Sequence, residues 1–187
     1  MQDLSLYLLD LVQNSLRAGC TKVHISLDFG SNCLTLTVQD NGCGMDEEQS
    51  RQALSPFYTT RTERTVGLGL PLFRMACEQT GGSFSLFSQE GKGTTVVGKF
   101  CTNQIDCPPL GKIGDTMAVL ISGNEAVQFY LEASRGTNRF QFDTQQVKEI
   151  LHDVPIRTSE VVIFLSQYIE EQTQIIRGGV MENEKSC

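Results

Sequence analysis

The sequence predicts an α/β fold followed by a small α+β region. Apolar residues recur with helical spacing in two segments of the first half, and they alternate with polar residues in four segments of strand length. The composition then changes near Cys107, where Pro108 and Pro109 stiffen the chain. We therefore expect an ordered domain over residues 1–104, a small α+β domain over 105–176 and a disordered tail over 177–187.

The first helix is predicted over residues 4–18, where leucines and a valine form a broad apolar face and Gly19 ends the pattern. The spacing of Asp10, Asn14 and Arg17 places them on one face of this helix. The following segments predict, in order, strands 22–29 and 33–39, a short helix 46–54, a loop 56–67, a helix 69–80 and strands 83–88 and 94–100.

The C-terminal region has a second run of predicted elements. The patterns indicate a helix over 111–122, a hairpin of strands 127–134 and 138–144, a helix ending near His152, and a last helix over 159–176. Asp143 or Thr144 is the expected cap of the helix before His152. The last helix carries an apolar stripe, which indicates either core packing or a subunit contact: Val161, Phe164, Leu165, Tyr168, Ile169 and Ile176.

The composition argues against several classes of function. A formal net charge of −7 repels a phosphate backbone, so no nucleic-acid partner is expected. The seven cysteines are odd in number and lack C-x-x-C spacing, which argues against a disulfide framework or a zinc site. The acidic N-terminus and the lack of an apolar run of about 20 residues argue against a signal peptide and a membrane span. The expected location is the reducing cytoplasm.

Four short motifs occur in order along the first half of the chain. One of them, from Gly67 to Leu70, opens a predicted helix, so its backbone N–H groups form a favourable phosphate site. Each motif alone is also typical of an ordinary turn, a solvated helix face or a loop-to-helix junction. The four are Asp10-x-x-x-Asn14, Asp40-x-Gly42-x-Gly44, Gly67-Leu68-Gly69-Leu70 and Gly93-Thr94-Thr95.

The side chains in these motifs suit a purine nucleotide and a metal ion. An amide oxygen is a hard, neutral ligand for Mg²⁺, which makes Asn14 a candidate metal ligand. Asp40, at the end of a predicted strand, can accept a hydrogen bond from the adenine amino group, a donor that guanine lacks at that place. Gly42 and Gly44 let the backbone pass close to the ring, and Met45 offers a polarizable surface for its face.

The ordered set of motifs resembles the ATP-binding domain of the GHKL superfamily, which includes gyrase, MutL and the histidine kinases. The resemblance covers residues 1–101, and the run PFYTTR, VGLGLPLF and GKGTT is most similar to the histidine kinases. The whole chain is also similar to small stand-alone ATP-binding proteins of anaerobic bacteria. The resemblance implies a Bergerat-type two-layer α/β sandwich, with a mixed, mainly antiparallel sheet and helices on one face, that binds ATP and Mg²⁺.

The resemblance also implies a role for each matching residue. Asn14 would hold Mg²⁺, and Met45 would pack on the base. Asp40 would bind the adenine amino group, with Thr94 helping directly or through water. Asp10 stands where the ATP-hydrolysing branches carry a glutamate that activates water, so it is the candidate catalytic residue. The others would line the nucleotide, its phosphates or the lid: Arg17, Gly42, Gly44, Arg61, Arg64, Gly67, Leu68, Gly69, Leu70 and Gly93.

Three departures from the family pattern bear on mechanism. Asp10 is one methylene shorter than glutamate, which shortens its reach towards an attacking water. The only histidines are His24 and His152, and neither lies in a kinase-like phosphoacceptor helix, so an acceptor would have to come in trans. The chain begins almost at the first helix of the pattern, so the C-terminal domain or a second subunit is expected to cover the exposed sheet edge.

Three functions follow as hypotheses. The first is a regulatory protein kinase that transfers the γ-phosphoryl group to a protein partner, since such transfer depends mainly on positioning and charge. The second is an ATPase-driven clamp in which ATP joins two subunits. The third is a non-catalytic module in which bound ATP orders the lid and creates a surface for a partner. The expectation is an ATP·Mg²⁺-binding regulatory protein with kinase-like or slow ATPase chemistry.

Overall fold

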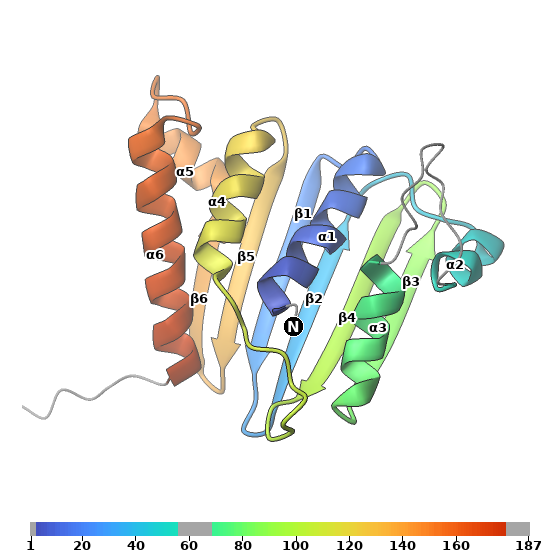
Figure 1. The fold of residues 1–187 in the computed structure, drawn as a ribbon. Coiled ribbons are helices and arrows are strands. Elements are labelled where there is room, and N and C mark those ends of the chain that lie inside the picture. The colour runs from blue at the N-terminus through green and yellow to red at the C-terminus, as the bar shows by residue number, and fades with distance from the viewer. Residues whose placement is uncertain (1–2, 56–68, 179–187) are drawn as a thin grey trace, which may run out of the picture.

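The computed structural model describes residues 3–55 and 69–178, which form one six-stranded sheet with helices packed against it (Figure 1). The strands are β1 (Lys22–Phe29), β2 (Cys33–Asp40), β3 (Ser83–Gln89), β4 (Gly93–Cys101), β5 (Gln128–Arg135) and β6 (Asn138–Asp143). The helices are α1 (Leu4–Arg17), α2 (Glu47–Ala53), α3 (Gly69–Gln79), α4 (Ile113–Gly123), α5 (Thr144–Leu151) and α6 (Ser159–Gly178).

The strand order across the sheet is β3-β4-β2-β1-β5-β6. Neighbouring strands are antiparallel, except that β1 and β5 run parallel. Figure 1 shows α1, α3, α4 and α6 side by side on the same face of this sheet. The predicted two-layer α/β sandwich, with a mixed and mainly antiparallel sheet and helices on one face, is therefore confirmed.

Alternation of apolar and polar residues decides which side of each strand is buried. In β2, Leu34, Leu36 and Val38 point towards the helices and are buried, and the residues between them are more exposed. Because the period of a strand is two residues, Asp40 takes the next position on the same face. A carboxylate is thus placed at the buried end of an otherwise apolar row.

Helix α1 packs over the apolar row of β2, and its polar face lies towards the end of the sheet that carries Asp40. Asp3 caps the helix, since its carboxylate accepts a hydrogen bond from the Leu6 amide at 2.9 Å. Leu8, Leu11 and Val12 are buried in the core and fix the rotation of the helix. That rotation leaves Asp10 and Asn14 on the side that faces the start of α3.

The two predicted domains share one sheet. The predicted boundary falls after residue 104, between β4 and α4, yet β5 pairs in parallel with β1 across it. The edge of β1 that was expected to need a cover is therefore covered by the C-terminal region. The division into domains over residues 1–104 and 105–176 stays a prediction.

The helix layer also continues across the predicted boundary. Helix α4 packs between α1 and α6. Gly114 permits the close approach of α4 and α6, because a methyl group there would lie 2.1 Å from the carbonyl oxygen of Ser166. Helix α6 extends two residues past the predicted end and includes Arg177 and Gly178, and residues 179–187 of the predicted tail lie outside the described residues.

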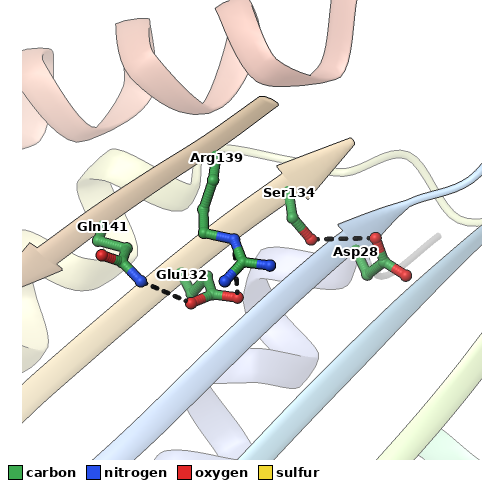
Figure 2. Close-up of polar contacts among 5 residues, drawn as sticks. All are labelled: Asp28, Glu132, Ser134, Arg139 and Gln141. Atoms are coloured by element: carbon green, nitrogen blue, oxygen red, sulfur yellow. Dashed lines mark hydrogen bonds and ion pairs between the residues drawn. The ribbon is translucent and has the colours of Figure 1, made fainter. Parts of the chain in front are cut away.

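The opposite face of the sheet carries mainly polar side chains. Figure 2 shows five of them on β1, β5 and β6. Gln141 donates a hydrogen bond to Glu132 at 3.0 Å, and the Arg139 guanidinium lies 3.7 Å from the same carboxylate. Ser134 donates to Asp28 at 3.0 Å. These contacts are typical of a solvated sheet surface.

Two further predictions concern disulfide bonds and membrane-spanning helices. The six cysteines in the described ranges 3–55 and 69–178 are all free thiols. In those same ranges, no helix combines the length and the apolar character that a bilayer crossing requires.

Candidate functional site

Asp40 is the centre of the candidate site. Only 8% of its surface is exposed, and both carboxylate oxygens are hydrogen-bonded. Its Oδ1 accepts hydrogen bonds from the backbone N–H groups of Gly42 at 2.9 Å and Thr94 at 3.2 Å. Its Oδ2 accepts the Ser15 hydroxyl at 2.6 Å. A carboxylate offers about four acceptor positions, so these three bonds leave one position on Oδ2 for a further donor.

The loop after Asp40 is held on both sides by hydrogen bonds. The Cys43 amide donates to the Ala18 carbonyl at the end of α1 at 2.8 Å, and the Cys43 carbonyl accepts from the Gly91 amide at 2.7 Å. The Met45 amide donates to the Ser88 hydroxyl at 2.8 Å. Gly42 is buried and Met45 is half-buried in this loop. These hydrogen bonds fix the backbone of the loop, as is required where a backbone passes close to a purine ring.

Glycines at two points of the site allow the backbones to come into contact. Gly93 has a φ of +101°, and a methyl group there would lie 2.0 Å from the Asp40 carbonyl oxygen. Gly44 has a φ of +66°, and a methyl group there would lie 2.0 Å from the Gln89 carbonyl oxygen. Both values lie in the left-handed region that favours glycine. These contacts lock the loop of residues 41–45 to the turn between β3 and β4.

Thr94 lies next to Asp40. Besides its amide bond to the carboxylate, its hydroxyl is 2.8 Å from the Ser88 hydroxyl. Ser88 also donates to the Gly93 carbonyl at 3.2 Å. The structure therefore links Asp40, Gly42, Gly93 and Thr94 through hydrogen bonds, and Gly44 packs against the same turn.

The second half of the site lies between α1 and the start of α3. A methyl group on Gly69 would lie 3.6 Å from Asp10 Cβ and 3.8 Å from Asn14 Nδ2. Asn14 and Arg17 are exposed, and an Arg17 guanidinium nitrogen donates to Asn14 Oδ1 at 3.2 Å. Asp10 and Asn14 thus face the N-terminal end of α3, the end that favours anions, and Arg17 is hydrogen-bonded to Asn14.

Asn14 suits a metal ion that takes most of its ligands from water and phosphate oxygens and few from the protein. Among residues 3–55 and 69–178, no group of three or more histidine, cysteine, aspartate or glutamate side chains converges in a way that holds a metal. Mg²⁺ usually retains water and phosphate oxygens and takes only one or two protein ligands. Asn14 fits that role, once its amide oxygen is released from Arg17.

Several predicted site residues fall outside this description. Arg61 and Arg64 of the predicted lid, together with Gly67 and Leu68, lie outside the described residues. Leu70 is described, and it packs half-buried against the hydrophobic core. Its side chain is thus used for packing, and its contribution to a phosphate site would come from its backbone.

Sequence reasoning missed two serines that complete the Asp40 unit. Ser15 is 5% exposed and lies among buried leucines of α1, so a polar residue at a core position was the available signal. Ser88 joins Met45 to Thr94, and nothing in the alternating pattern of β3 marked it. Cys20 also lies near Asp40, and burial together with the Asp40 charge raises the pKa of its thiol to about 11, so it stays neutral.

Replacing Ser15 by alanine is expected to weaken ligand binding at Asp40. The change removes the one donor to Oδ2 found within residues 3–55 and 69–178, and it leaves a buried oxygen short of a partner, which costs about 1–3 kcal/mol. Ser5→Ala is the matched control, because Ser5 is equally buried on the same helix and its hydroxyl donates to Asp3 instead. Thermal unfolding and nucleotide titration of both variants would check this. Equal loss of affinity in both would contradict a specific role for Ser15.

Comparison with known proteins places this geometry in a family context. The model of a family described as histidine kinase-, DNA gyrase B-, and HSP90-like ATPase matches residues 2–104, more than half of the chain. A putative sensor protein of Shewanella frigidimarina is 34% identical over 99 residues, which are 51% of this chain and 15% of that protein. The tetrathionate sensor histidine kinase TtrS of Salmonella typhimurium is 36% identical over 93 residues, 48% of this chain and 16% of the kinase.

The matched relatives are much longer than the matching segment. This chain spans about a sixth of the length of the two sensor proteins. Among solved structures, the N-terminal domain of a DNA repair protein aligns with a TM-score of 0.52 and 18% identity, over 75% of this chain and 52% of that one. At that identity, the similarity concerns the fold alone.

Proposed function

The chain belongs to the family of histidine kinase-, DNA gyrase B- and HSP90-like ATPases, and we propose that it binds ATP with Mg²⁺ between α1, the loop after β2 and the start of α3. The observation that carries this proposal is the buried carboxylate of Asp40, which keeps one acceptor position after three internal hydrogen bonds. Such a fixed acceptor matches an exocyclic amino group and rejects a carbonyl oxygen.

The same carboxylate accounts for the choice of base. Adenine presents an amino donor where guanine presents an oxygen, so Asp40 would form a hydrogen bond with the first and repel the second. The rigid loop of residues 41–45 would lie along the ring, with Met45 against its face. Because these groups are held by backbone contacts, little ordering would be required on binding.

The triphosphate would extend from this point towards α3. Its charge is favoured at the helix N-terminus, next to Gly69, and the exposed Arg17 guanidinium lies on the same side of α1. Bound Mg²⁺ would neutralise phosphate charge and polarise the terminal phosphoryl group. The Asn14 amide oxygen would hold the ion, in exchange for its present hydrogen bond with Arg17.

The finer function we propose is regulation of a protein partner by phosphoryl transfer or slow ATP hydrolysis. Similarity to the sensor histidine kinase TtrS supports transfer, and the acceptor would be a group on another protein. An internal transfer to His24 is not proposed, because His24 lies on the face of the sheet opposite to Asp40, edge-on against Tyr130 with a centroid distance of 4.6 Å. The second candidate is an ATP-gated module without turnover, favoured by the short side chain of Asp10.

Turnover of an Asp10→Ala variant separates these two candidates. If Asp10 activates water, the variant should lose about 100-fold in hydrolysis rate and keep its ATP affinity, since removal of a general base costs about 10²–10⁴-fold. Asp10→Glu is the control, because the longer carboxylate should retain or raise the rate. Phosphate release and ATP titration would be measured on the same samples. An unchanged rate in Asp10→Ala would remove the hydrolytic role and favour the gated module.

A further inference from the structure

Strand β6 forms an edge of the sheet with unused backbone groups. In antiparallel pairs, residues alternate between hydrogen-bonded and non-hydrogen-bonded positions. The Phe129 amide of β5 points towards the β6 side, where it donates to Thr144 Oγ1 at 2.9 Å. By this alternation, the backbone N–H and C=O groups of Arg139, Gln141 and Asp143 in β6 point away from β5. Within residues 3–55 and 69–178, no strand pairs with that edge.

An apolar hollow lies beside this edge. It has a volume of about 620 Å³ and is lined by residues of β6, α5 and α6, among them Phe142, Val147, Ile150, Val161, Phe164 and Tyr168. Ile150 is 76% exposed and Phe164 is 62% exposed, and the Phe164 ring stacks on Tyr168. The stripe predicted on the last helix is thus divided, because Leu165 and Ile169 are in the core and Phe164 is left outside.

We propose that a second copy of this chain binds along β6, so that the two sheets join across a two-fold axis. Two identical strands that pair across a two-fold axis must be antiparallel. The axis then passes either through one pair of facing residues or midway between two such pairs. Hydrogen bonds across the axis require the outward-facing residues to lie opposite each other. The register that uses the full strand is centred on Gln141, which then faces the partner's Gln141.

This register is complementary on both faces of the sheet. On the polar face it sets Arg139 opposite the partner's Asp143, and the symmetry repeats that ion pair. On the helix face it sets Phe140 opposite the partner's Phe142, which extends the apolar row. In the single chain the Arg139 guanidinium lies 3.7 Å from the Glu132 carboxylate (Figure 2). Opposite charges and aromatic pairs at facing positions both stabilise strand pairs.

The helix layer fits the same arrangement. Helix α6 packs on both β5 and β6 and ends the helix layer at that side (Figure 1). Strands are spaced about 4.8 Å apart, so a helix centred over β5 and β6 and its symmetry mate would lie about 10 Å apart. That is an ordinary interaxial distance for packed helices. The exposed Phe164 ring would then lie between the two helices.

The first test is the mass of the protein in solution. Light scattering after gel filtration should give twice the 20.7 kDa of one chain for the wild type. Phe164→Lys should raise the dimer dissociation constant about tenfold or more, as expected for a buried aromatic contact. Gln141→Pro should act similarly, because it removes an outward N–H and leaves the bonds to β5. Val119→Lys on α4 is the matched control, since Val119 is also 62% exposed but lies away from β6, and it should remain dimeric.

The second test examines the register in an otherwise native chain. Gln141→Cys should form an intermolecular disulfide under mild oxidation by oxygen, with two thiols losing their protons and electrons to the oxidant, because facing Cα atoms are about 5.5 Å apart. Arg139→Cys is the control on the same strand and face, because its symmetry mate is about 14 Å away in this register. A cross-link confined to Gln141→Cys supports the proposal. A wild-type monomer at all concentrations, or a dimer that survives both Phe164→Lys and Gln141→Pro, would overturn it.

The proposed interface and the proposed nucleotide site can be tested separately, and a negative result for one leaves the other unchanged. Strand β6 is separated from β2 by two strands, and Asp40 makes no contact with the edge. A variant that cannot bind ATP should therefore still dimerise in the absence of nucleotide. Loss of the dimer would leave the assignment of the ATP site unchanged.

Discussion

Asp40→Asn is expected to lower ATP affinity about 100-fold or more while the protein stays folded. Oδ1 accepts two backbone N–H groups, so the amide oxygen must take that place and the amide nitrogen must replace Oδ2. The nitrogen can donate to the Ser15 hydroxyl, which keeps the internal network intact. It then presents a donor to the adenine amino group, and two donors repel each other.

The same variant should also reduce the preference for ATP over GTP, because an amide donor faces the guanine oxygen favourably. Asp28→Asn is the matched control: Asp28 lies on the neighbouring strand β1, on the open face, where it accepts the Ser134 hydroxyl. Calorimetric titration with both nucleotides, together with thermal unfolding, would check the prediction. Normal ATP affinity in Asp40→Asn would show that this carboxylate does not read the base.

Gly93→Ala is expected to disrupt the site and to destabilise the fold by about 3 kcal/mol or more. The added methyl group would meet the Asp40 carbonyl oxygen at 2.0 Å, and the φ of +101° is itself unfavourable for alanine. Relief of that contact must move the end of β2 away from β4. Asp40 would lose its bond from the Thr94 amide, and nucleotide affinity would fall with stability.

Gly91→Ala separates the steric contact from the backbone preference. Gly91 lies in the same turn with a φ of +75°, and a methyl group there meets no atom within 4 Å. Its replacement should cost only about 1 kcal/mol, the usual penalty for alanine in the left-handed region. Denaturant unfolding of both variants would measure the difference. Equal stability of the two variants would contradict the close approach of the backbones at Gly93.

Local patterns predicted those parts of the site that depend on short-range periodicity. The two-residue period of β2 places Asp40 on the buried face, and the helical period of α1 places Asp10 and Asn14 together. Turn chemistry at Gly93 followed from a glycine-rich segment between two strands. These features are set by a few neighbouring residues, so the sequence alone could indicate them.

Contacts between distant segments could not be predicted in the same way. The parallel pairing of β1 with β5 joins residues about a hundred positions apart, and no local pattern encodes such a partner. The bond from Ser15 to Asp40 depends on the depth at which α1 packs on the sheet. Phe164 belongs to an apolar stripe in the sequence, yet the side of α6 that packs on α4 and the sheet leaves it exposed. Tertiary packing, which the pattern does not specify, determines all three.

The most direct test of the proposed nucleotide site is a calorimetric titration of the wild-type chain with ATP and with GTP, each in the presence of Mg²⁺. We expect that one ATP binds per chain, that removal of Mg²⁺ weakens its binding, and that GTP binds far more weakly. Failure to bind ATP, or equal affinity for both nucleotides, would contradict the assignment of Asp40 as the acceptor that reads the base.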